Sequence, residues 1–131
     1  MKELKIGIKG TAALTVTSQE LAVNMGSGSL EVFATPSMIA LMEKSACNCL
    51  APFLEGDETT VGTELNVKHI SATPAGLEVT AEAVLTEING RKFTFEVTAS
   101  DSAGVIGNGT HKRFLVYGEK FTAKTKSKLD K

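Results

Sequence analysis

The chain has 131 residues, 42% of them hydrophobic, and its fourteen basic and fifteen acidic residues give a formal net charge of −1. This length predicts a single domain over residues 1–131, which can bury roughly two-thirds of its unfolded surface. The near-neutral charge argues against nucleic acid or an anionic membrane as the main partner, and it leaves small molecules and other proteins.

The N-terminal residues, the length of the apolar runs and the cysteines bear on the cellular compartment. The residues from Met1 to Lys5 lack the apolar core of a signal peptide, and no apolar run approaches the ~20 residues that a membrane-spanning helix needs. We therefore expect a cytoplasmic protein. Cys47 and Cys49 lie two apart on a predicted helix, roughly 200° around its axis, so we expect them neither to pair nor to share a metal ion.

The N-terminal region predicts a strand and then a flexible loop. Apolar residues alternate with polar ones from Leu4 to Ile8 and again from Leu14 to Val16, which is the period of a half-buried strand. Gly10 is expected to interrupt this strand. A Gly- and Ser-rich loop over residues 24–29 then leads to the next element.

A helix is predicted from Pro36 to about Leu50. The Thr35 side chain can cap its free N–H groups, and Pro36 suits the first helical position. At about 100° per residue the apolar side chains fill one wide arc, which is typical of a helix buried by a sheet. Glu43 lies at the edge of that arc, where a partly desolvated carboxylate is a candidate base.

From Thr60 to Val116 the apolar period becomes two, which predicts strands. Asn89-Gly90 is expected to form a hairpin turn with positive φ at both positions. Three sets of residues are expected to face inward: Thr63, Leu65, Val67 and His69; Leu77, Val79, Ala81, Ala83 and Leu85; Phe93, Phe95, Val97 and Ala99. The tail over residues 119–131 is rich in lysine and has little to bury.

One early buried helix followed by a meander of long antiparallel strands predicts an α+β protein, in which a strongly curved sheet wraps around the helix. A single helix covers only part of such a sheet. We therefore expect pairing with a second copy, through an edge strand or an open face.

Several short motifs occur in an informative order: Val-Phe-Ala-Thr at 32–35, Leu41-Met42-Glu43, Val61-Gly62-Thr63 before His69, and the run from Gly107 to Arg113. From about Ile6 to Lys124 their order and spacing resemble the hot-dog-fold thioesterases, in the branch that includes the fluoroacetyl-CoA thioesterases. The resemblance implies a hot-dog domain and hydrolysis of a short or small acyl-CoA thioester, which is compatible with the homodimer expected from the sheet.

The same resemblance implies specific site residues. Thr35, Glu43 and His69 match the catalytic set, the amide of Gly62 would help to bind the thioester oxygen, and Arg113 matches an arginine near the acidic residue. No metal or cofactor is implied, because coenzyme A enters as part of the substrate. Thr35 could attack the thioester directly or orient a water molecule.

Each of these residues also has an ordinary structural role. Thr35 could be only a helix cap, Glu43 a surface acid paired with a base such as Arg113, and His69 a satisfied core residue. His111, beside Lys112 and Arg113, is expected only to line the sheet.

A distance constrains the catalytic set. Thr35 and Glu43 are eight residues apart, which is roughly 12 Å along one helix, so they cannot touch within a chain. We expect His69 to bridge them, or a two-fold dimer to bring one of them across from the second copy.

One departure from the resemblance concerns the substrate. In the fluoroacetyl-specific enzymes the loop before the helix supplies aromatic residues, whereas here that stretch is Gly26 to Leu30, without an aromatic residue. Fluoroacetyl-CoA is therefore not the expected substrate.

Two alternative functions remain: a non-catalytic acyl-CoA-binding or regulatory protein, and acyl transfer to an acceptor other than water. The tail lysines could contact coenzyme A phosphates or simply keep the protein soluble.

Overall fold

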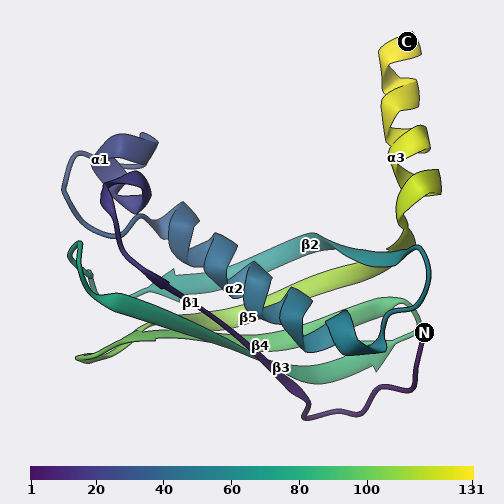
Figure 1. Ribbon diagram of the computed structural model, residues 1–131, viewed down its shortest axis with the longest axis horizontal. Coiled ribbons are helices and arrows are strands. Elements are labelled where there is room, and N and C mark those ends of the chain that lie inside the picture. The colour runs from purple at the N-terminus through teal and green to yellow at the C-terminus, as the bar shows by residue number, and fades with distance from the viewer.

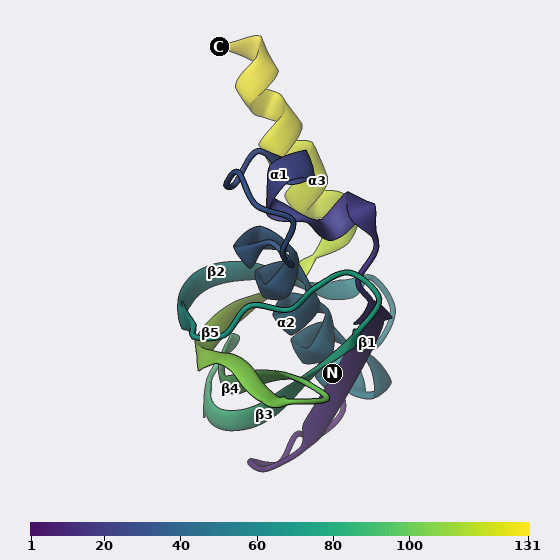
Figure 2. The same cartoon turned by 90° about the vertical axis from the view of Figure 1, so that its left-hand side faces the viewer.

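Five antiparallel strands form one sheet that curves around a single long helix in the computed structural model, which describes residues 1–131 (Figures 1 and 2). The strands are β1 (Lys9–Thr15), β2 (Glu58–His69), β3 (Glu78–Asn89), β4 (Lys92–Asp101) and β5 (Gly104–Tyr117), in the order β1-β3-β4-β5-β2. The helices are α1 (Ala22–Met25), α2 (Thr35–Leu50) and α3 (Gly118–Lys126). The predicted α+β architecture is confirmed.

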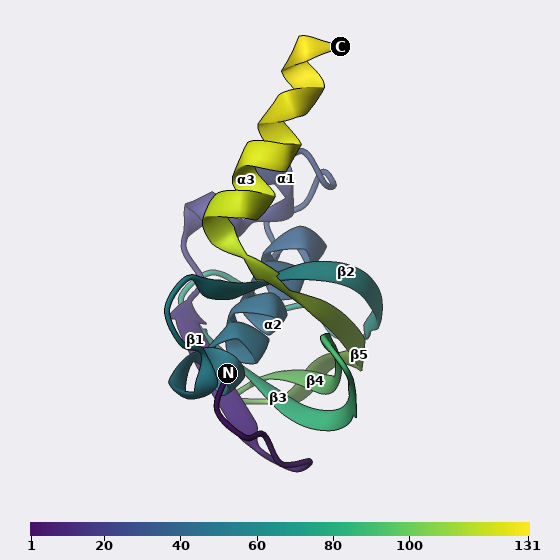
Figure 3. The same ribbon diagram turned by 90° about the vertical axis from the view of Figure 1, so that its right-hand side faces the viewer.

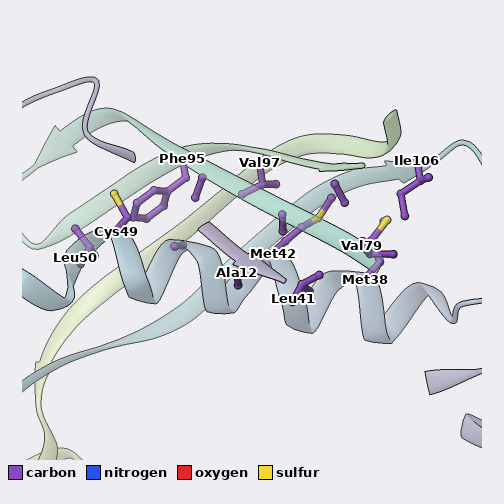
Figure 4. Packing of buried hydrophobic residues seen from close by; sticks show 14 of the residues in the cluster. Ala12, Met38, Leu41, Met42, Cys49, Leu50, Val79, Phe95, Val97 and Ile106 are labelled. Carbon is purple, nitrogen blue, oxygen red and sulfur yellow. The ribbon is translucent and has the colours of Figure 1, made fainter. Parts of the chain in front are cut away.

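The core lies between α2 and the concave face of the sheet. From the helix, Met38, Met42 and Leu50 are completely buried. Figure 4 shows their side chains directed at the strands, with Phe95, Val97 and Ile106 among the residues opposite. The inward sets predicted for β3 and β4 are confirmed, since Val79 to Leu85 and Phe93 to Ala99 bury every second residue.

Two glycines bring the helix close to the sheet. A Cβ atom on Gly10 of β1 would overlap the helix backbone at Ser45 and Cys49, and one on Gly107 of β5 would overlap the Met38 side chain. The expected interruption of β1 at Gly10 is therefore wrong. The glycine lies within the strand, because only a residue without a side chain allows this contact.

Strand β2 contains a bulge that the apolar period does not reveal. Gly62 pairs with Arg113 of β5 and Glu64 pairs with Lys112, so Thr63 has no partner and its side chain is exposed. The prediction that Thr63 faces inward with His69 is wrong, because a bulge shifts the alternation by one residue.

The hairpin between β3 and β4 is present, but its turn is shifted by one residue. Asn89 pairs with Lys92, so the central residues are Gly90 and Arg91. Only Gly90 has a positive φ, of 62°. This matches a turn with glycine at its first central position, rather than the predicted pair of positive φ values at Asn89 and Gly90.

The lysine-rich tail forms α3, which continues from β5 and points away from the sheet (Figures 1 and 3). None of its residues is buried. No helix of the structure has the length and apolar character that crossing a bilayer requires.

Candidate active site

The first residue of α2 is paired with the last residue of β2. Thr35 Oγ1 lies 2.8 Å from His69 Nδ1. The N-cap of the helix is Ala34, and no side chain caps it. The capping role considered for Thr35 is therefore wrong, because its hydroxyl is directed at the imidazole instead.

His69 has the properties of a proton acceptor. Burial holds its pKa below the ordinary value of 6.5, so the ring is neutral at pH 7. Its Nε2 atom is buried and has no hydrogen-bond partner within the chain. When the Thr35 hydroxyl donates to Nδ1, the ring proton is on this second nitrogen.

A cleft of about 400 Å³ opens beside this pair. Thr35, His69 and Phe33 line it together with two loops, over residues 27–30 and 70–72. The first loop is the aromatic-free stretch identified in the sequence. It contributes Ser27, Gly28, Ser29 and Leu30, so no aromatic ring from this loop covers the cleft at Thr35 and His69.

Glu43 lies farther along α2, in an ion pair. Its Oε2 atom is 3.1 Å from Nη1 of Arg113, with 38% of the Glu43 side chain and 7% of the Arg113 side chain exposed. Thr60 of β2 holds the guanidinium from the other side, through its hydroxyl at 2.9 Å and its carbonyl at 3.1 Å. The arginine predicted to lie near the acid does so, and the acid is paired rather than free in solvent.

Gly62, a residue of β2, lies directly beside this ion pair. A Cβ atom there would lie 2.6 Å from Glu43 Oε2 and 3.2 Å from Arg113 Nη1. Any side chain at this position would displace the carboxylate. Gly62 is thus placed beside Glu43 and not among the residues that line the Thr35 cleft.

His111 also belongs to this cluster, although the sequence indicated only a lining role. Its Nε2 atom is 3.0 Å from Arg113 Nη1, its Nδ1 atom is 2.9 Å from the carbonyl of Glu64, and the side chain is 1% exposed. The signal available in the sequence was the spacing, since His111 and Arg113 are two apart on a strand and therefore share a face.

The predicted residues thus form two groups, Thr35 with His69 and Glu43 with Gly62 and Arg113. Within this chain His69 does not bridge them: its Nδ1 contacts Thr35, while Arg113 holds Glu43. Thr35 and Glu43 therefore stay separated by roughly 12 Å along α2 within one chain.

Comparisons with known proteins agree with this structure. The model of the fluoroacetyl-CoA-specific thioesterase family matches residues 16–119. The fluoroacetyl-CoA thioesterase of Streptantibioticus cattleyicolor is 45% identical over 98 residues, which cover 75% of this chain and 70% of that protein. A solved structure of the fluoroacetyl-CoA thioesterase FlK matches with a TM-score of 0.91 at 35% identity, over 97% of this chain and 98% of that one.

More distant structures share the fold. A thioesterase-superfamily protein of Thermus thermophilus matches with a TM-score of 0.91 at 23% identity, over 99% of this chain and 96% of that one. A hot-dog-like protein of Thermanaerovibrio acidaminovorans matches with a TM-score of 0.84 at 18% identity, over 94% of this chain and 91% of that one. The chain therefore has the hot-dog fold and belongs to the fluoroacetyl-CoA-specific thioesterase family, a family of thioester hydrolases.

Proposed function

We propose that this protein is a homodimeric acyl-CoA thioesterase that hydrolyses the thioester of a small acyl group to the free acid and coenzyme A. The observation that carries the proposal is the 2.8 Å contact between Thr35 Oγ1 and His69 Nδ1 beside an open cleft. Variants of FlK have been solved with acetyl-CoA and with fluoroacetate and CoA, so a closely similar fold accommodates such ligands.

The chemistry begins at the neutral imidazole. His69 Nδ1 takes a proton from the Thr35 hydroxyl. The Thr35 oxygen then either attacks the thioester carbonyl itself or takes a proton from a bound water molecule, whose oxygen attacks the carbonyl instead. Negative charge develops on the carbonyl oxygen. The free N–H groups at the start of α2, with the positive end of the helix dipole, are suited to stabilise it. The carbon–sulfur bond then breaks, and the coenzyme A thiolate takes the proton that His69 had accepted. If Thr35 was the nucleophile, a water molecule deprotonated by His69 then hydrolyses the threonine ester and releases the free acid.

The second subunit supplies the other half of the site in this proposal. Glu43 and the Gly62 amide of one chain would approach Thr35 and His69 of the other, because they cannot reach them within one chain. The unpartnered Nε2–H of His69 is a suitable donor to a carboxylate. Strand β2 carries both Gly62 and His69 at an edge of the sheet, where an unpaired backbone can meet a second copy.

The cleft also supports a substrate preference. Ser27 to Leu30 place no aromatic side chain over the cleft, so the acyl group is not tightly enclosed. We propose small acyl groups other than fluoroacetyl as the preferred substrates.

Release of free thiol from a panel of acyl-CoAs tests the activity. His69→Ala and Glu43→Gln should each lower kcat by a factor on the order of 10²–10⁴, the usual contribution of a general acid or base. Glu78→Gln, a change at an exposed glutamate of β3, is the matched control and should leave turnover unchanged. Binding without turnover by the native protein would indicate a regulator instead, and thiol release that depends on an added acceptor would indicate a transferase.

Mixing two inactive variants tests the shared site. Thr35→Ala and Glu43→Gln homodimers should both be inactive, whereas random exchange of subunits should restore about a quarter of native activity, since half the dimers then carry one intact site of two. No recovery after verified exchange would show that each chain builds its own site. Analytical ultracentrifugation gives the oligomeric state directly.

A further inference from the structure

We infer that His111 is a positioning residue for Glu43: it acts as a neutral Nδ1–H tautomer that fixes the Arg113 guanidinium, which in turn fixes the carboxylate. This inference rests on the proposed function, because it concerns the acid of the proposed site. It assigns a role to a buried histidine that the sequence indicated only as a lining residue.

The neighbours of His111 determine its tautomer. The carbonyl of Glu64, 2.9 Å from Nδ1, can only accept a hydrogen bond, so Nδ1 must carry a proton. The guanidinium of Arg113, 3.0 Å from Nε2, can only donate, so Nε2 must be bare. Both neighbours therefore require the same neutral form, and a doubly protonated ring would oppose an N–H group to the guanidinium.

The charge state agrees with this geometry. Burial, assisted by the nearby charge of Arg113, lowers the pKa of His111 below its ordinary value of 6.5. The ring also lies against Phe95, with centroids 6.2 Å apart and planes at 29°, so its orientation is fixed by packing as well as by hydrogen bonds.

His111 completes the support of the guanidinium. The Thr60 hydroxyl and carbonyl bind Nε and Nη2, and His111 binds one N–H of Nη1. The second N–H of Nη1 then points to Glu43 Oε2 at 3.1 Å. Without His111, Nη1 would have Glu43 as its only partner, and the carboxylate could turn or move with it.

The imidazole has no direct access to a substrate. It is 1% exposed and does not line the cleft at Thr35. Its loss should therefore change the rate of the chemical step and leave substrate binding almost unaltered, because a positioning residue acts through the geometry of the reacting group.

The kinetic test compares a substitution that removes both hydrogen bonds of His111 with one that can restore the bond to Arg113. His111→Phe keeps a ring against Phe95 and removes both hydrogen bonds, and should lower kcat by a factor on the order of 10–100 with KM changed by less than about twofold. In His111→Gln the side-chain carbonyl can accept from Arg113 near the former Nε2 position, so most of the loss should be recovered. A rise in KM at native kcat, or equal kcat losses in both folded variants, would overturn the inference.

A double-mutant cycle separates positioning from general destabilisation. In the Glu43→Gln background, His111→Phe should cause no further loss of kcat, because the group that His111 positions is already absent. Additive losses would contradict the inference. If instead Glu43→Gln alone retains native kcat, the proposed role of Glu43 fails, which is a different outcome from the failure of His111 alone.

Nitrogen NMR of the native protein gives a test that requires no substitution. At pH 7 the imidazole of His111 should show a protonated Nδ1 and a bare Nε2. A protonated Nε2, in either the other neutral tautomer or the cation, would overturn the inference even if His111→Phe fails to fold.

Discussion

The Thr35–His69 pair and the Glu43–Arg113–His111 cluster lie on the same helix and sheet, yet their polar atoms are satisfied differently. At the first, one hydrogen bond joins the side chains and His69 Nε2 has no partner. At the second, four N–H groups of Arg113 are engaged by Glu43, His111 and Thr60. The first region can exchange a proton, whereas the second is a preformed support. Changes at the first should cost activity alone, and changes at the second should cost both activity and stability.

The largest effect on activity is expected at the pair. Thr35→Val keeps the shape of the side chain and removes the hydroxyl, and it should lower kcat by a factor on the order of 10² or more. The free energy of unfolding should change by less than about 1 kcal/mol, because Thr35 is exposed and loses one hydrogen bond. Urea unfolding and thiol release measure both quantities. Thr80→Val, on the exposed face of β3, is the control, and a large loss of stability in Thr35→Val would contradict the comparison.

The cluster should respond in both measurements. Arg113→Met removes the donor for His111 Nε2 and Thr60 Oγ1, and unsatisfied buried groups cost roughly 1–3 kcal/mol each. We also expect kcat to fall at least about tenfold, since Glu43 loses its anchor. Lys112→Met is the matched control: its surface pair with Glu64, at 3.7 Å, should contribute less than about 1 kcal/mol. Native stability in Arg113→Met would remove the distinction between the two regions.

Lowering the pH should reduce the contributions of both His69 and His111 to the free energy of unfolding. Burial lowers the pKa values of His69 and His111 from 6.5, so the unfolded state binds more protons as the pH falls. Their stabilisation is therefore fully present above about pH 6.5 and is lost as the pH falls from there through the folded pKa values. His111→Gln should make this dependence shallower in urea titrations between about pH 5 and 7.5. A stability that rises on acidification through this range would disprove the assignment.

A moderate effect is expected in the cleft loop. Ser29→Phe places an aromatic ring in the open cleft and should lower kcat/KM for longer acyl chains by about tenfold relative to acetyl-CoA, in line with the discrimination that a methylene group gives in a pocket. The acyl-CoA panel measures this ratio. An unchanged ratio would show that the acyl group binds elsewhere.

The smallest effect is expected at the C-terminus. Removing residues 121–131 deletes most of α3, none of whose residues is buried. The free energy of unfolding should change by less than about 0.5 kcal/mol, as for most surface changes. If turnover falls while stability does not, the helix contacts coenzyme A or the second subunit.

Much of the fold follows from the apolar pattern. The helix from Thr35 to Leu50 was predictable because a wide apolar arc has to be covered, and β3 and β4 because every second residue is apolar. The bulge at Thr63 was not, because a bulge adds one residue without any change in composition. The course of β1 through Gly10 depends on the helix that packs against it, which no local pattern contains.

The identities of the site residues were predictable from the sequence, but the contacts between them were less so. The resemblance indicated Thr35, Glu43, His69, Gly62 and Arg113, and the structure places these residues in two groups. It could not show that His111 would contact the guanidinium that holds Glu43, since this group of side chains joins α2 to β5 across the fold. Only the spacing of His111 and Arg113 hinted at that link.

The glycines beneath α2 have a mechanical consequence. The helix rests against the sheet at Gly10 and Gly107, and Glu43 rests above Gly62. Thr35 and Glu43 belong to the same α-helix, so their separation along its axis is set at roughly 12 Å by the helical rise. A side chain at Gly10 would press on the backbone of α2 at Ser45 and Cys49 and would shift the helix, and with it both Thr35 and Glu43. The geometry of the site therefore depends on the absence of side chains at these glycines as well as on the residues that line the cleft.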